Sequence, residues 1–229
     1  LRDFPSASDY LSDMYLIQRD HGAISNQHLA QRLQVSTSAV SQAVGRLKKL
    51  GLVSQEPYGA MVLTEPGREL AVMVLRRHYL LEHLLVRQLG YPWDKADAEA
   101  RVLQNHISQD LAEHLDIRMG HPQTCPHGNP LPGVPLEASL LAAPRLDSLA
   151  AGTVCQVLRI TEEGEAVPAM LPFCERHGIR PAVRLQVTAR DTDNLELRTE
   201  SDGQEVFMMP LALAAHIGIR AEPASGQTD

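Results

Sequence analysis

Residues 25–63 read SNQHLAQRLQVSTSAVSQAVGRLKKLGLVSQEPYGAMVL, and this stretch decides the fold. Apolar residues recur at helical spacing in two segments that a short polar turn separates. Ser25 and Ser36 stand where the capping hydroxyl of each helix is expected. Two short apolar stretches follow, with Pro57-Tyr58-Gly59 between them, which is typical of a β-hairpin. The order predicts a helix-turn-helix followed by a β-hairpin wing.

The second of these helices, residues 36–50, has the side chains that are suited to contact DNA. It is rich in small and polar residues, and Arg46, Lys48 and Lys49 lie near its end. Small polar side chains can approach base edges in the major groove, and cations beside them can hold phosphates. The stretch therefore predicts a DNA-binding domain in which this segment is the recognition helix.

Helices are expected on both sides of this stretch, and strands only near the end of the chain. A first amphipathic helix covers about 10–20, and a long helix begins after Thr64 and runs to about Leu89. Further helices follow Asp94 and Ser108, and the segment 119–135 is dense in Pro and Gly without a helix or strand signal. The expected strands are 153–160, 183–190, 195–199 and 204–208, with short helices near 166–176 and 210–216.

Together these segments predict a mainly α protein with small β parts. We expect a winged helix-turn-helix at 1–72 and a helical domain with its Pro/Gly-rich linker at 73–143. Short strands at close spacing predict a small barrel at 144–221. The polar segment 222–229 is expected to be a disordered tail.

The charge distribution is compatible with DNA binding although the net charge is −7. Residues 1–76 hold eight Lys or Arg and seven Asp or Glu, whereas the remainder holds thirteen and twenty-one. Phosphate contact depends on local charge, so an acidic remainder does not oppose it. No apolar run approaches the roughly 18–20 residues of a membrane span, and the first residues carry no secretory signal pattern. Three scattered cysteines favour a reducing compartment, so we expect a cytoplasmic protein without membrane contact.

Four motifs stand in order along the chain. They are SNQHLAQRLQVSTSAVSQAVGRLKKLGLV from Ser25, LTEPGRELAVMVLRRHYLLEHLL from Leu63, YPWD at 91–94 and GHPQTCPHGNPLPG from Gly120. With these motifs in this order, the chain resembles the diphtheria toxin repressor and manganese transport repressor family of metal-responsive bacterial regulators. The resemblance covers nearly the whole chain.

The resemblance implies a winged-helix DNA-binding domain, a helical dimerisation domain that also carries metal ligands, and a terminal SH3-like barrel. It implies a homodimer on a palindromic double-stranded operator, because one recognition helix covers too few base pairs to be selective. The implied function is transcriptional regulation, as a repressor, of manganese or iron homeostasis, with Mn(II) or Fe(II) as the cofactor.

The resemblance places the base contacts at the start of the recognition helix. Gln42 can pair with adenine and Ala39 can touch a thymine methyl group. The alternative is that Ser41 and Gln42 only present a solvated helix face. The residues expected to contact DNA are Ser36, Thr37, Ser38, Ala39, Ser41, Gln42 and Arg46.

Only part of the implied set of metal ligands is present. The surviving candidates are Asp9, His78, Glu82 and Asp97. His78 and Glu82 are four residues apart, so they face one side of the long helix. The ligand positions of the barrel fall on Val167 and Met170, and Glu165 is near them.

The remaining positions depart from the family pattern. Where the family has a Cys or Glu followed by a Glu-His pair, this chain has Arg101, Gln104 and Asn105. Ser12 replaces a further acid of the manganese branch. Arg keeps its positive charge and has no lone pair to give, so it cannot be a ligand.

Three interpretations of these departures stay open. A reduced site of His78, Glu82 and Asp97, with Asp9 or Glu165, binds manganese or iron weakly. Alternatively, the guanidinium of Arg101 substitutes for the metal by pairing with Asp9 or Glu82, and DNA binding is independent of metal. In the third interpretation, His78 and Glu82 keep no function on a solvated surface.

Other histidines and cysteines are expected to be structural. His106, Asp110 and His114 would share one face of a continuous helix as a zinc site does, but Ser108 is expected to break that helix. His121, Cys125 and His127 also resemble zinc ligands, although the surrounding Pro and Gly already explain a rigid turn. Cys155 and Cys174 are expected to pack in the core.

Two alternative functions differ in class from a metal-responsive regulator. A winged-helix regulator of the multiple-antibiotic-resistance type would sense a small molecule. An enzyme would use Cys125 with His127 or His121, but the sequence offers no nucleophile with a base and an orienting third group. We therefore expect a protein that is not an enzyme.

Overall fold

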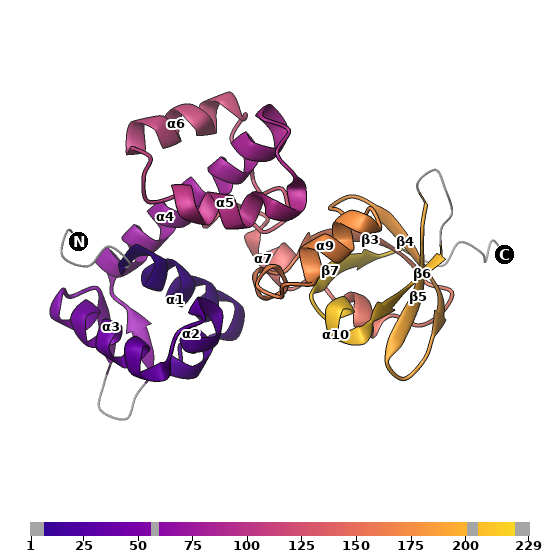
Figure 1. The fold of residues 1–229 in the computed structure, drawn as a ribbon, viewed down its shortest axis with the longest axis horizontal. Coiled ribbons are helices and arrows are strands. Elements are labelled where there is room, and N and C mark those ends of the chain that lie inside the picture. Colours follow the sequence, from indigo (N-terminus) through magenta and orange to yellow (C-terminus); the bar gives the residue numbers. More distant parts are fainter. Residues whose placement is uncertain (1–6, 56–59, 201–205, 223–229) are drawn as a thin grey trace. The chain divides into compact units, whose positions relative to one another are not determined.

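The computed structural model describes residues 7–55, 60–200 and 206–222, and the chain divides into two compact units. The first unit runs to residue 81 and includes 100–116, and the second comprises 82–99 and the residues from 117 onward. Figure 1 labels the helices and strands of both units. Each unit is described by itself below.

The first unit begins with the predicted winged helix-turn-helix. Its elements are α1 (Ala7–His21), α2 (Asn26–Leu33), α3 (Thr37–Lys49), β1 (Val53–Gln55) and β2 (Met61–Leu63). The two strands pair antiparallel and form the wing. The expected turn Pro57-Tyr58-Gly59 lies outside the described residues.

The two predicted helix caps are confirmed. The Oγ of Ser25 accepts a hydrogen bond from the His28 N–H, and the Oγ of Ser36 accepts one from the Ala39 N–H, both at 3.1 Å. Each hydroxyl satisfies a backbone donor that would otherwise have no partner at the helix start. The caps therefore fix where α2 and α3 begin, and with them the turn between the two helices.

Helix α4 (Glu65–His83) is the predicted long helix. Thr64 starts it, since its Oγ1 accepts from the Gly67 N–H at 3.3 Å. A π-helical turn, η1 (Leu84–Gln88), extends it to Leu89, after which Gly90 takes a positive φ of 62°. Gly67 lies against the backbone of Leu52, where a Cβ would overlap the Leu52 carbonyl oxygen. This contact lets α4 start directly beside the wing.

Shorter helices follow. They are η2 (Trp93–Lys95), α5 (Ala96–Leu103), α6 (Gln109–Arg118), α7 (Glu137–Leu141) and η3 (Leu146–Ser148). The Ser108 Oγ accepts from the Leu111 N–H at 3.1 Å, so α6 restarts as predicted, and His106 lies before that restart. The Pro/Gly-rich segment contains no helix, and its one backbone bridge joins Thr124 and Pro130.

The second unit contains a five-stranded antiparallel sheet of order β6-β5-β4-β3-β7. Its strands are β3 (Val154–Ile160), β4 (Arg184–Arg190), β5 (Asn194–Thr199), β6 (Val206–Pro210) and β7 (Ile217–Ala221). The first four are the predicted strands, whereas β7 was not predicted. Short helices lie between them: α8 (Glu162–Glu165), α9 (Met170–Arg176) and α10 (Leu211–Ala214).

Alternate residues of these strands build one apolar core. Val157 of β3 and Leu197 of β5 are fully buried, as the period-two pattern of a half-buried strand requires. Cys155 and Cys174 lie in this core, as expected, and all three cysteines are free thiols. The expected β domain is confirmed as a five-stranded antiparallel sheet with this core. The expected tail 222–229 lies outside the described residues beyond Glu222.

A substitution at Gly67 tests the close contact between α4 and the wing. Gly67→Ala should lower the free energy of unfolding by about 2 kcal/mol, because the added Cβ overlaps rigid backbone. Gly45→Ala is the matched control, since nothing lies within 4 Å of a Cβ at this α3 position. That control should raise stability by roughly 0.5–1 kcal/mol. Urea unfolding of both variants checks the pair, and equal stability of Gly67→Ala and the wild type would contradict the packing.

Candidate functional site

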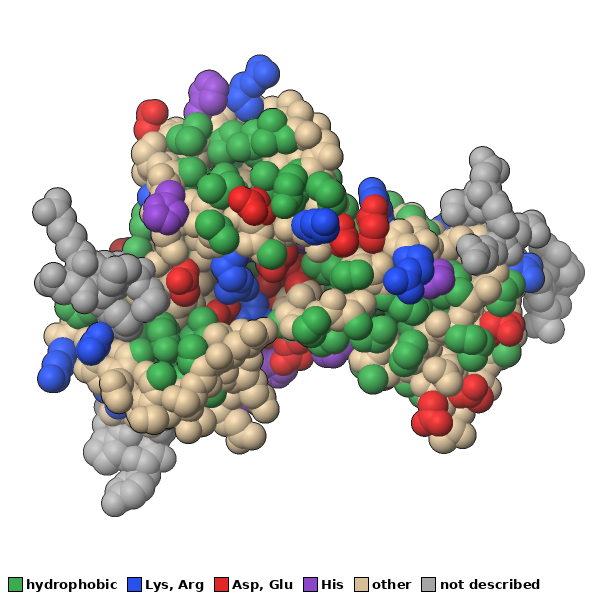
Figure 2. All heavy atoms as spheres, viewed as in Figure 1, with side chains coloured by type: hydrophobic (Ala, Val, Ile, Leu, Met, Phe, Trp, Pro, Cys, Tyr) green, Lys and Arg blue, Asp and Glu red, His purple; other side chains and the backbone are tan. Residues whose placement is uncertain are grey.

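The recognition helix α3 divides into a buried face and an exposed face. Val40 and Leu47 are fully buried, and Ala43 and Val44 nearly so. The residues predicted to contact DNA lie on the other side: all are exposed except Ala39, which is half-buried. Figure 2 shows Lys and Arg side chains in the region where Figure 1 places α3. The helix can therefore present polar side chains and cations to a duplex.

Two of the predicted DNA-contacting hydroxyls also serve the fold. Ser36 caps α3, and the Ser41 hydroxyl donates to the Thr37 carbonyl oxygen at 2.9 Å and accepts from the Asn26 Nδ2–H at 3.1 Å. The wing is tied to the same helix, because the Lys48 ammonium donates to the Gln55 Oε1 at 2.7 Å. The longer polar side chains exposed on α3 are Gln42, Arg46, Lys48 and Lys49.

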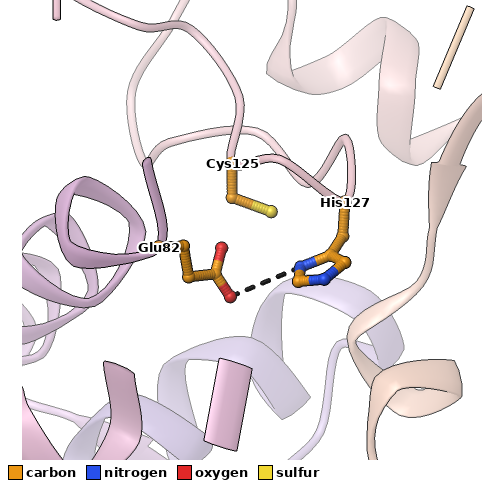
Figure 3. A group of neighbouring side chains, drawn as sticks. All are labelled: Glu82, Cys125 and His127. Atoms are coloured by element: carbon orange, nitrogen blue, oxygen red, sulfur yellow. Dashed lines mark ion pairs between the residues drawn. The ribbon is translucent and has the colours of Figure 1, made fainter. Parts of the chain in front are cut away.

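The second unit holds a buried group of metal-binding side chains. Glu82 comes from α4, and Cys125 and His127 come from the Pro/Gly-rich segment. One ligand atom of each lies within 4.8 Å of the others, and Figure 3 shows the three side chains pointing toward one another. Glu165 of α8 completes what we call the buried cluster (Glu82, Cys125, His127 and Glu165). The His127 Nδ1 lies 3.4 Å from Glu82 Oε1 and 3.7 Å from Glu165 Oε2.

Hydrogen bonds to backbone and side-chain groups orient His127 and Glu165 within the buried cluster. The His127 Nε2 lies 3.0 Å from the Trp93 carbonyl oxygen, an acceptor, so Nε2 carries a proton and Nδ1 faces the acids. The Asn129 Nδ2–H donates to the Glu165 Oε1, so the other carboxylate oxygen faces His127. Nδ1 is therefore the ring nitrogen that would bind a metal ion, with the ion taking the place of its proton.

The turn that carries Cys125 and His127 is itself fixed. The Cys125 N–H donates to the Asn129 carbonyl oxygen at 2.8 Å, and the Ile160 N–H donates to the His127 carbonyl oxygen at 2.8 Å. Gly128 has a φ of 92°, and a Cβ there would overlap the Leu158 carbonyl oxygen. Only glycine fits this position, which explains part of the motif's composition.

The electrostatics of the buried cluster favour a cation. The side chains of Glu82 and His127 are fully buried, and that of Glu165 is 3% exposed. Burial lowers the pKa of His127, but the charges of Glu165 and Glu82 raise it by more. The pKa of His127 is therefore raised to about 10. Burial raises the pKa of Glu165 and of the Cys125 thiol well above their ordinary values. Neither His127 Nδ1 nor Glu165 Oε2 makes a hydrogen bond within the described residues. Such atoms are costly to bury unless a ligand satisfies them.

The predicted ligands fall into two places. Glu82 lies with His78, one turn earlier in α4, and a ligand atom of Glu82 lies within 4.8 Å of one of Asp97. Asp9 lies in the first unit, where its Oδ1 accepts from the Gln104 Nε2–H and the Asn105 Nδ2–H, each at 2.9 Å. Arg101 lies 3.6 Å from Asp13, an acid that the sequence analysis did not consider.

Sequence reasoning undervalued Cys125 and His127. The Pro and Gly residues around them do form the expected rigid turn, yet the same turn brings the two side chains to Glu82. The signal available in the sequence was the Cys-x-His spacing, which places two donors on one turn. Of the barrel positions, Val167 and Met170 pack with the apolar core, and Glu165 faces His127.

The comparisons with known proteins agree with this geometry. Residues 4–61 match the family model described as iron dependent repressor, N-terminal DNA binding domain. Residues 64–133 match the model described as iron dependent repressor, metal binding and dimerisation domain. The chain belongs to the iron-dependent repressor family.

Relatives and solved structures support the same assignment. The iron-dependent repressor IdeR of Mycobacterium tuberculosis is 32% identical over 215 residues, which cover 90% of this chain and 92% of the relative. The diphtheria toxin repressor of Corynebacterium glutamicum is 33% identical over 125 residues, covering 55% of each chain. A manganese-dependent transcriptional repressor in complex with manganese is 33% identical with a TM-score of 0.78, covering 93% of this chain and 98% of that one. These relatives are repressors, not enzymes.

Metal binding at the buried cluster can be measured as thermal stabilisation. Mn(II) at about a hundred times its Kd should add roughly 2.7 kcal/mol, which raises Tm by several degrees. His127→Ala should remove this rise, because the imidazole leaves the site. His114→Ala, an exposed histidine on α6, is the control and should keep the full rise. An unchanged rise in His127→Ala would place the ion elsewhere.

Proposed function

We propose that this protein is a metal-responsive transcriptional repressor that binds a palindromic operator as a homodimer. The carrying observation is the buried cluster, because it joins two buried carboxylates, an imidazole and a thiol in a chain that also exposes a recognition helix. The matching relatives are named as iron- or manganese-dependent repressors, which supports genes of manganese or iron homeostasis as the targets.

Mn(II) or Fe(II) is the ion that we propose. Two carboxylates and one imidazole suit both ions, and the thiol of Cys125 favours Fe(II) of the two because the thiolate is the softer donor. Glu82, His127 and Glu165 would hold the ion, with Cys125 as a fourth donor, and the bound charge would neutralise the acids. Such an ion controls DNA binding only through a difference in its affinity for the DNA-binding and non-binding arrangements.

Exposed apolar residues support the proposed homodimer. Val102 of α5 is 62% exposed, and Leu111 and Ile117 of α6 are 42% and 65% exposed. Figure 2 shows hydrophobic side chains over the region of α5 and α6, which the metal-binding and dimerisation model covers. Large apolar side chains gathered on a surface favour association with another protein surface.

The site of action that we propose is the cytoplasm, where the operator is. None of the helices within the described residues has the length and apolar character needed to span a membrane.

A gel-shift titration tests the proposed function. The full chain is titrated onto the DNA upstream of its own gene, with Mn(II), with Fe(II) under anaerobic conditions, and with a chelator. Metal should tighten binding by roughly 5- to 150-fold, the range of typical coupling between two sites. Glu82→Gln keeps the size of the side chain but loses its charge, so it should abolish the metal response. Equal affinity with metal and chelator would overturn the proposed metal control.

Substitutions on α3 separate base recognition from phosphate binding. Gln42→Ala should weaken binding to the operator by about 1–3 kcal/mol and leave binding to unrelated DNA unchanged, since it removes a base contact. Arg46→Ala should weaken binding to both kinds of DNA. The slope of log K against log salt concentration should become shallower by about the amount that one phosphate contact contributes. Fluorescence anisotropy over a salt series measures both effects. Equal loss on operator and unrelated DNA by Gln42→Ala would contradict its role in base recognition.

A further inference from the structure

A chain of hydrogen bonds links the start of α1 to the end of α5. The Asp9 Oδ1 accepts from the Gln104 Nε2–H and from the Asn105 Nδ2–H, both at 2.9 Å. The Ser8 hydroxyl donates to the Asn105 Oδ1 at 2.8 Å. We call Ser8, Asp9, Gln104 and Asn105 the Asp9 network. Ser8 and Gln104 are buried, Asp9 is half-buried and Asn105 is exposed, so the network lies at the edge of the unit.

A second acid of α1 lies one turn later, and two arginines lie beside it. The Arg32 Nε–H donates to the Asp13 Oδ1 at 2.6 Å, and the Arg101 guanidinium lies 3.6 Å from the Asp13 Oδ2. Asp13 is 1% exposed, so these cations compensate a charge that is almost wholly buried. Asp9 and Asp13 are thus both held by donors from other segments of the same unit.

This arrangement does not fit a divalent ion. The family resemblance places metal ligands at positions 9, 12, 101, 104 and 105. Here Gln104 and Asn105 direct amide N–H groups, which have no lone pair, toward the carboxylate. The Ser8 hydroxyl donates to the carbonyl oxygen of Asn105, which supports this orientation of the amide. Ser12 donates its hydroxyl to the Asp9 carbonyl oxygen, and a guanidinium cannot ligate.

We infer that the Asp9 network replaces an ion, so that α1 is held against α5 by the protein's own side chains. The chain then binds a single ion, at the buried cluster, and α1 is ordered whether or not that ion is present. Metal would act on the second unit without building the contact between α1 and α5.

Metal stoichiometry and hydrogen exchange test this inference on the full chain. Protein that has been freed of metal with a chelator is equilibrated with Mn(II). The manganese bound per chain is then measured by elemental mass spectrometry. The wild type should bind one ion. The triple variant Arg101→Glu, Gln104→Glu, Asn105→His supplies lone-pair donors at the same positions and should bind two. Two ions on the wild-type chain would overturn the inference.

The order of α1 is measured by amide exchange in chelator and in Mn(II). The wild type should protect the α1 amides equally in both. The double variant Gln104→Ala, Asn105→Ala should exchange about tenfold faster there in both conditions, as expected for the loss of hydrogen bonds to a charged group. Gln109→Ala, an exposed glutamine on α6, is the control and should match the wild type. Protection of α1 that depends on Mn(II) would overturn the network.

The outcomes also separate this inference from the proposed function. A wild-type chain that binds no ion but protects α1 in chelator would support the Asp9 network and overturn the proposed metal response. A chain that responds to metal at the operator but binds two ions would do the reverse.

Discussion

Carboxylates removed from water must find a cation or enough hydrogen-bond donors, and this requirement shapes both units of the molecule. In the first unit, Asp13 meets two arginines and Asp9 meets two amides. In the second unit, Glu165 and Glu82 face one histidine, which cannot neutralise both. The acids of the first unit therefore have cations or amide donors beside them, whereas the two acids of the second unit share one histidine. Arg32, Arg101, Gln104 and Asn105 supply the donors of the first unit.

Helix α4 relates this charge requirement to the DNA-binding elements. Its first turn lies against the backbone of Leu52 through Gly67, and the Thr64 hydroxyl donates to the Gly51 carbonyl oxygen at 2.7 Å. Its last turn carries Glu82. The same helix thus contributes one residue to the wing contact and one to the buried cluster.

Much of the fold could be predicted because local patterns decided it. The caps of Ser25, Ser36 and Ser108 lie where the sequence placed them, since a hydroxyl before an apolar repeat leaves little choice for a helix start. Strand β7 was missed because only Ala215 and His216 separate it from α10, and neither is a residue type that marks a turn. Its antiparallel pairing with β3, which the local sequence does not predict, makes this segment a strand.

The candidate site was harder to predict than the fold. His78 and Glu82 were found because helical spacing places them on one face. Cys125, His127 and Asp13 were undervalued or missed because their partners lie far along the chain. Glu82 is more than forty residues from His127, and Arg32 is nineteen from Asp13. The local spacing of apolar and polar residues does not predict contacts over such a distance along the chain. The departures at Gln104 and Asn105 were visible in the sequence, but only coordinates show that their amides bind Asp9 directly.

The turn from Cys125 to Asn129 leans on strand β3 through the His127 carbonyl oxygen, the Asn129 amide and the bare Cα of Gly128. Glu165 follows the same strand within one short helix. The terminal β domain therefore supplies one wall of the buried cluster. A chain shortened before β3 would lose both Glu165 and the backbone that fixes the turn of Cys125 and His127.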